Sequence, residues 1–167
     1  YTSLQDALPA APKPKEVEGA YQYVDLIGKQ KPNPPEVSIS PKEDVAVIQY
    51  TGGTTGVPKG AMLTHFNLVV NTVQCVKWGT ILKKGEETGV GNLPLFHIYG
   101  MTVGMNTATM LAISSALNPD PRDFSTLLGL IRQHRPTTFP AVPTMFIRML
   151  QHKDFEKSLD AIKHIKY

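Results

Sequence analysis

The chain of 167 residues has the size of one domain and can bury about 70% of its unfolded surface, so it can form a core. Its 17 lysines and arginines exceed its 14 acidic residues, giving a net charge of +3, but they are scattered without interleaved aromatics, which argues against nucleic acid as a partner. The single cysteine, Cys75, excludes a disulfide framework or a thiolate metal site, and it predicts a reducing, cytoplasmic environment. The sequence has no apolar run long enough to span a membrane, which predicts at most peripheral membrane contact.

Prolines are concentrated in residues 1–41, at positions 9, 12, 14, 32, 34, 35 and 41. Since proline lacks a backbone N–H and fixes φ, this segment is predicted to be an extended lead-in with at most a short strand or helix around Tyr23 to Gly28. From residue 42 to 167, strand patterns and helix patterns alternate, which predicts one α/β subdomain.

The stretch from Tyr50 to Gly60, YTGGTTGVPKG, has the composition of a phosphate-binding loop. The apolar run before it, residues 44–50, predicts a buried strand, and Thr64 after it is placed to N-cap a helix with apolar residues at helical spacing. A strand, a glycine loop and a helix in this order direct backbone amides and a helix dipole at an anion. Because glycines allow close approach, threonines supply hydroxyls and lysine supplies charge, the candidate ligands are Thr51, Gly52, Gly53, Thr54, Thr55, Gly56 and Lys59.

Strands and helices continue to alternate after this unit. Strands are predicted over residues 89–95, 112–117 and 137–142, and helices are predicted after His97, after Asp120 and from Pro143. Asp120 is expected to cap the second of these helices with Pro121 at its first position, so that Leu127, Leu128 and Ile131 face the core. The alternation predicts an α/β fold with a doubly wound, largely parallel sheet and helices on both faces.

The loop fits neither of the two common nucleotide fingerprints. Lys59 follows a proline and precedes a glycine, unlike the lysine of a Walker A loop, and the G-x-G-x-x-G pattern of dinucleotide sites does not occur there. The loop instead resembles the signature of the adenylate-forming superfamily, Y-T-[SG]-G-T-T-G-x-P-K-G, at every defined position. This superfamily includes acyl-CoA synthetases, luciferases and peptide-synthetase adenylation domains. Gly52 occupies the serine-or-glycine position of the signature, and a glycine there resembles the fatty-acyl-CoA ligases more than the peptide adenylation domains. A flexible surface turn is the alternative for a short Gly/Thr-rich loop, but the length of the match favours phosphate binding.

A second segment, NLPLFHIYG at residues 92–100, resembles the next motif of the superfamily, in which an aromatic-His pair opens a helix along the acyl pocket. This resemblance implies that His97 faces the carboxylate that becomes adenylated, whereas a lone histidine beside aromatics is otherwise more often a packed residue. Gly100, Gly104 and Ala108 are spaced by four on the helix that follows. Small residues on one helix face leave room either for another backbone or for a thin apolar ligand, and the sequence does not distinguish the two.

The resemblance implies a reaction in which ATP and a fatty acid or related carboxylate form an acyl-adenylate and pyrophosphate, after which CoA forms a thioester. The loop would hold the β and γ phosphates of ATP, and the Thr51 hydroxyl would also reach Mg²⁺. The chain corresponds to a section of the superfamily's large N-terminal domain. The family's adenine and ribose contacts and its C-terminal catalytic lysine have no counterpart in these residues, so we expect the chain to depend on the remainder of the parent polypeptide and to be inactive alone.

Two other functions fit the same residues. Another adenylating enzyme, such as an aryl-CoA ligase or a peptide-synthetase adenylation domain, would carry the same loop. A truncated module that binds a nucleotide or a partner protein without chemistry is the alternative from a different class. The carboxylate accepted by the whole protein distinguishes the first alternative from a fatty-acyl-CoA ligase.

Overall fold

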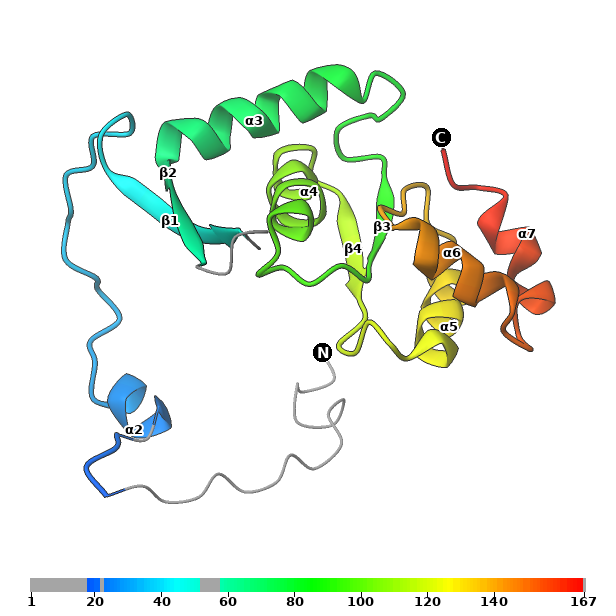
Figure 1. Ribbon diagram of the computed structural model, residues 1–167, viewed down its shortest axis with the longest axis horizontal. Coiled ribbons are helices and arrows are strands. Elements are labelled where there is room, and N and C mark those ends of the chain that lie inside the picture. Colours follow the sequence, from blue (N-terminus) through cyan, green and yellow to red (C-terminus); the bar gives the residue numbers. More distant parts are fainter. Residues whose placement is uncertain (1–17, 22, 52–57, 167) are drawn as a thin grey trace. The chain divides into compact units, whose positions relative to one another are not determined.

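A computed structural model describes residues 18–21, 23–51 and 58–166 (Figure 1). The chain divides into two compact units, Tyr1–Ile39 and Ser40–Tyr167. In the first unit, the segment that the sequence leaves open as a strand or a helix forms the short helix α2 (Tyr23–Gly28), which has no buried residue. The second unit contains the elements β1 (Val45–Thr51), β2 (Lys59–Thr64), α3 (His65–Trp78), β3 (Thr88–Gly91), η1 (Gly100–Asn106), α4 (Thr107–Met110), β4 (Ser114–Leu117), α5 (Phe124–His134), α6 (Pro143–Leu150), η2 (Glu156–Ser158) and α7 (Leu159–Ile162).

The strands β1 and β2 form an antiparallel hairpin whose register ends with Thr51 opposite Lys59. The sequence predicts the first strand within one residue at each end, but it does not predict the second strand that lies between the loop and the helix. Residues 59–64 complete a ladder of backbone hydrogen bonds with β1. Gly60 allows this pairing because a Cβ there would lie 2.7 Å from Cγ2 of Ile48.

The helix α3 begins where the sequence predicts, after Thr64. The Asn67 N–H donates to Thr64 Oγ1 at 3.2 Å, and the Thr64 N–H donates to Asn67 Oδ1 at 3.0 Å, which makes a reciprocal capping box. The apolar residues predicted for this helix differ in burial. Val70 and Val76 are half-buried, whereas Phe66, Val69 and Val73 are exposed.

The strands β3 and β4 pair in parallel, from Thr88 opposite Ser114 to Gly91 opposite Leu117. β4 lies within the predicted strand over residues 112–117, β3 begins one residue before the predicted strand over residues 89–95, and both are shorter than predicted. The predicted strand over residues 137–142 is reduced to one parallel bridge between Thr138 and Gly89, since prolines at 140 and 143 cannot donate to a ladder. The described residues therefore form an α/β fold with two short sheets, and a doubly wound, largely parallel sheet is not confirmed.

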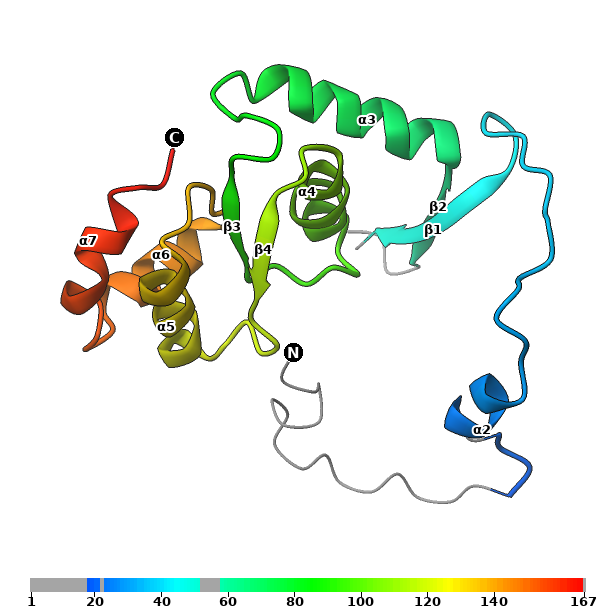
Figure 2. The same ribbon diagram turned by 180° about the vertical axis from the view of Figure 1, so that it is seen from behind.

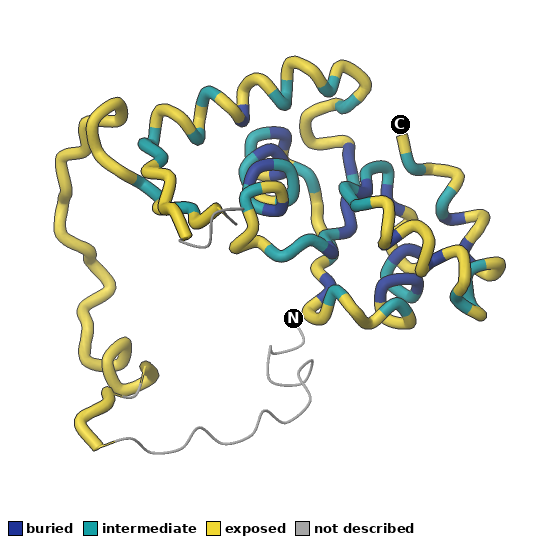
Figure 3. Tube along the Cα trace, in the orientation of Figure 1, coloured by how far each residue is buried: buried dark blue, intermediate teal, exposed yellow. Residues whose placement is uncertain are grey.

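Helices lie on both sides of β3 and β4 (Figures 1 and 2): α3 and α4 on one side, and α5, α6 and α7 on the other. The second group encloses the core, where Leu127, Leu128 and Ile131 are fully buried, as the sequence predicts (Figure 3). Further members of this core are Val90, Phe139, Met145, Met149 and Ala161. No helix in the described part of the chain is long and apolar enough to cross a membrane.

The cap of α5 differs from the prediction. Asp123, and not Asp120, caps the helix by accepting the Thr126 N–H at 3.0 Å. Asp120 instead pairs with Arg122, whose Nε lies 3.1 Å from Asp120 Oδ1. The helix consequently begins at Phe124, and Pro121 lies outside it. At α6 the predicted start is confirmed, with Pro143 at the first helical position.

Candidate active site

The hairpin brings together the first and last candidate ligands of the phosphate loop. Thr51 and Lys59 are partners in the ladder, and the Thr51 hydroxyl donates to the Lys59 carbonyl oxygen at 3.3 Å. Both residues are exposed, and Lys59 has no ion pair with any residue that the structure describes. The remaining candidates, Gly52, Gly53, Thr54, Thr55 and Gly56, lie outside the described residues.

His97 lies in the exposed turn that connects β3 to the helix η1. The His97 N–H donates to the Pro94 carbonyl at 3.1 Å, and His97 Nδ1 accepts the Tyr99 N–H at 3.2 Å. In the neutral ring the hydrogen is therefore on Nε2. This arrangement makes the exposed edge of His97 a hydrogen-bond donor, which suits a carboxylate ligand better than a role as proton acceptor.

The three small residues after His97 have different surroundings. A Cβ on Gly100 would lie 2.2 Å from the Pro94 carbonyl oxygen, so this glycine allows two backbone segments to pack closely. Gly104 and Ala108 instead line a cavity. Gly100 therefore serves close backbone packing, whereas Gly104 and Ala108 border open space.

The cavity lies between the end of α3, the strand β3 and the segment formed by η1 and α4. Its volume is about 540 Å³, which is within the usual range of small-molecule sites. Its wall is mostly apolar or glycine, and residues from all three elements contribute, among them Cys75, Trp78, Gly89, Gly91, Gly104 and Ala108. Cys75 is half-buried in this wall.

One charged side chain at the cavity wall, Lys166, forms an ion pair with the fully buried carboxylate of Glu87 at 2.6 Å. Glu87 also accepts the Thr137 hydroxyl at 2.5 Å and the Lys83 N–H at 2.8 Å. Burial favours a raised pKa, but the hydrogen bonds from Lys166, Thr137 and Lys83 and the charge of Lys166 outweigh it and lower the pKa of Glu87 to about 2. The sequence gives no signal for this pair, because Glu86 and Glu87 are adjacent and only the fold distinguishes them.

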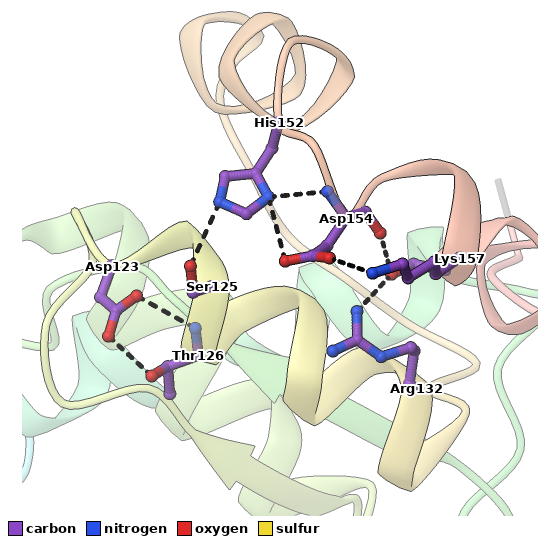
Figure 4. A network of polar contacts seen from close by, with 8 residues as sticks. Asp123, Ser125, Thr126, Arg132, His152, Asp154 and Lys157 are labelled. Carbon is purple, nitrogen blue, oxygen red and sulfur yellow. Dashed lines mark hydrogen bonds and ion pairs between the residues drawn. The ribbon is translucent and has the colours of Figure 1, made fainter.

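A second polar cluster joins the start of α5 to the segment after α6 (Figure 4). His152 Nε2 lies 3.2 Å from the Ser125 hydroxyl, and Asp154 follows two residues after the histidine. A serine nucleophile needs a ring nitrogen that accepts its proton. Here Nδ1 accepts the Asp154 N–H at 3.2 Å, so Nε2 of the neutral ring donates to Ser125, and the Asp154 carboxylate is 3.9 Å away. The cluster therefore connects two helical segments and does not activate a nucleophile.

The sequence of the loop resembles that of the adenylate-forming superfamily, and the comparisons with known proteins agree. The sequence profile of the AMP-binding enzyme family matches residues 2–166, so the chain belongs to this family.

Two curated relatives and one solved structure show which members of the family this chain resembles. The chain is 44% identical over 128 residues to a long-chain-fatty-acid–CoA ligase of Bacillus subtilis, covering 75% of this chain and 22% of that protein. It is 40% identical over 116 residues to a long-chain-fatty-acid–CoA ligase of Escherichia coli, covering 69% and 21%. Among solved structures, ATP-bound MatB from Rhodopseudomonas palustris aligns with a TM-score of 0.70 at 29% identity, over 85% of this chain and 27% of that one. The chain thus spans about a fifth of the length of these curated relatives.

Proposed function

We propose that the chain is a section of an ATP-dependent long-chain fatty-acid–CoA ligase, in which it holds the ATP phosphates and forms one wall of the acyl site. The observation that carries the proposal is the root of the Gly/Thr-rich loop, where Thr51 and Lys59 face each other across the hairpin. The 44% identity to a long-chain-fatty-acid–CoA ligase supports the same activity. In the whole protein, the short parallel sheet of β3 and β4 would extend into the larger doubly wound sheet that the sequence predicts.

The loop would act on the β and γ phosphates of ATP. Lys59 would neutralise charge on the leaving pyrophosphate, since an exposed ammonium at the loop root can approach a phosphate oxygen. The glycines and threonines between Thr51 and Lys59 would supply backbone and hydroxyl donors. The loop would thereby bind and orient the nucleotide, while groups elsewhere in the parent polypeptide would complete the reaction.

Mg²⁺ fits these residues only as a partner shared with the phosphates. Thr51 Oγ1 makes one long hydrogen bond and retains lone pairs for a metal. Across the described residues there is no cluster of three or more acidic, histidine or cysteine side chains that could hold a metal. A single protein oxygen is compatible with Mg²⁺, because this ion usually takes most of its ligands from phosphates and water. Bound in this way, it would neutralise phosphate charge.

His97 and the cavity would place the carboxylate substrate. The Nε2–H of His97 would donate to the carboxylate, and the acyl chain would run along η1 and α4, where Gly104 and Ala108 line the cavity. CoA would then accept the acyl group from the adenylate. Its binding site would lie in other parts of the parent protein.

Replacing Lys59 with alanine in the full-length polypeptide tests the loop. We expect pyrophosphate release from ATP and hexadecanoate to fall about 10- to 100-fold, the effect of one lost hydrogen bond to a charged group. Lys59→Arg should retain part of the activity, and Lys84→Ala, a change at another exposed lysine, should have no effect. Full activity of Lys59→Ala would contradict the assignment.

A further inference from the structure

Trp78, the only tryptophan of the chain, is 91% exposed at the last residue of α3. Leaving so large an apolar side chain in water gives up a large contribution from burial. The side chain is not an isolated surface residue, because it lines the 540 Å³ cavity together with Gly79 and Leu82 from the turn that follows. An exposed aromatic at the edge of an apolar cavity is placed to cover an apolar ligand.

The position of Trp78 along α3 sets its distance from β2. This helix starts directly after β2, whose first residue is Lys59, and its 14 residues extend about 21 Å. Trp78 therefore lies at the end of α3 opposite to the end that follows β2. On the opposite wall, Val103, Gly104 and Ala108 follow His97 in sequence and line the same cavity. A ligand whose carboxylate lies near His97 can follow this wall toward the end of α3.

We infer that Trp78 covers the methyl end of a fatty acyl chain in this cavity and so determines the preference for long chains. The inference rests on the proposed function, because it takes the acyl chain of that reaction as the occupant. Gly104 leaves space for the chain, since a Cβ there would meet only Leu95 Cδ2 at 3.7 Å, and the indole offers a large apolar surface at the end of α3. A short acyl chain does not reach the end of α3, so the contribution of Trp78 depends on chain length.

Chain-length kinetics of the full-length polypeptide test this dependence. For Trp78→Ala we expect kcat/KM to fall about tenfold with hexadecanoate and to be unchanged with octanoate, because only the long chain loses buried apolar contact. Trp78→Phe should retain most of the wild-type kcat/KM with hexadecanoate. Lys77→Ala, on the same helical turn, should have the kcat/KM of the wild type with both acids. Unchanged activity with octanoate also shows that the variant is folded. An equal loss at both chain lengths would indicate a structural role and would overturn the inference.

Fluorescence quenching provides a test that does not require turnover. The signal of Trp78 is the difference between wild type and Trp78→Phe, and the probes are hexadecanoic acids brominated either at the terminal carbon or beside the carboxylate. Stronger quenching by the terminal bromine is expected, and equal quenching by both probes would contradict the inference. If the terminal bromine quenches Trp78 but the protein releases no pyrophosphate with any fatty acid, the proposed function is wrong and the assignment of Trp78 to a fatty-acid site stands. If pyrophosphate is released and neither quenching nor chain-length preference involves Trp78, the inference fails alone.

Discussion

Gly100→Ala is expected to destabilise the chain by about 3 kcal/mol or more. The new Cβ would lie 2.2 Å from the carbonyl oxygen of Pro94 and 2.9 Å from its carbonyl carbon, so one of two backbone segments must move. Such overpacking exceeds the roughly 1 kcal/mol that alanine gains over glycine in a helix interior. Because the affected turn contains His97, the movement would also displace the proposed carboxylate contact.

Gly104→Ala is a matched control in the same helical segment. Its Cβ would meet only Leu95 Cδ2 at 3.7 Å, an ordinary van der Waals contact, so this variant should be as stable as the wild type or slightly more stable. Urea unfolding followed by far-ultraviolet circular dichroism measures both changes. Equal stability of Gly100→Ala and the wild type would show that the two backbone segments are not in close contact.

Glu87→Ala should cost about 3 kcal/mol of unfolding free energy at pH 7. The substitution leaves the Lys166 ammonium, the Thr137 hydroxyl and the Lys83 N–H without their shared acceptor, and removing one partner of a buried pair is strongly destabilising. This loss of stability lies at the low end of the range for breaking a buried ion pair, because the Lys166 side chain is 35% exposed and can reach water. Glu86→Ala is the control, since that neighbour has only an exposed salt bridge with Lys83.

The pH dependence of this difference follows from the lowered pKa of Glu87. Folding lowers that pKa to about 2, so the carboxylate stabilises the folded state fully above the unfolded pKa of roughly 4.3. The contribution is lost as pH falls through the interval between these values. The stability difference between wild type and Glu87→Ala should therefore be constant near neutral pH and should shrink between about pH 4.3 and 2. A difference that grew on acidification would contradict the assigned ion pair.

Features with local causes were predictable from the sequence. Thr64 caps α3 through Asn67 three residues later, and Pro143 begins α6 through its own ring geometry. The buried face of α5 was likewise visible in its apolar spacing. At Asp120 and Asp123 the sequence offers two acidic caps within four residues, and in the fold the first pairs with Arg122 while the second caps the helix.

Features that depend on distant partners were not predictable. Residues 59–64 form a strand because β1 offers a pairing edge, and residues 137–142 remain nearly unpaired because of Pro140 within them and Pro143 directly after them. Glu87 is separated from Thr137 by 50 residues and from Lys166 by 79. The cavity beside Gly104 similarly requires three elements to meet. For the loop, the sequence identified the candidate ligands, and the hairpin that joins Thr51 to Lys59 emerged only from the fold.

The central claim is that this chain serves the adenylation of a long-chain fatty acid, and the most direct measurement is carboxylate-dependent pyrophosphate release by the full-length polypeptide. Hexadecanoate, an aromatic carboxylate and a set of amino acids would be compared at equal ATP and Mg²⁺, with CoA added to follow the thioester. We predict that release is greatest with hexadecanoate and that CoA converts the product to the acyl thioester. Preference for an aromatic or amino acid, or no release with any carboxylate, would contradict the account.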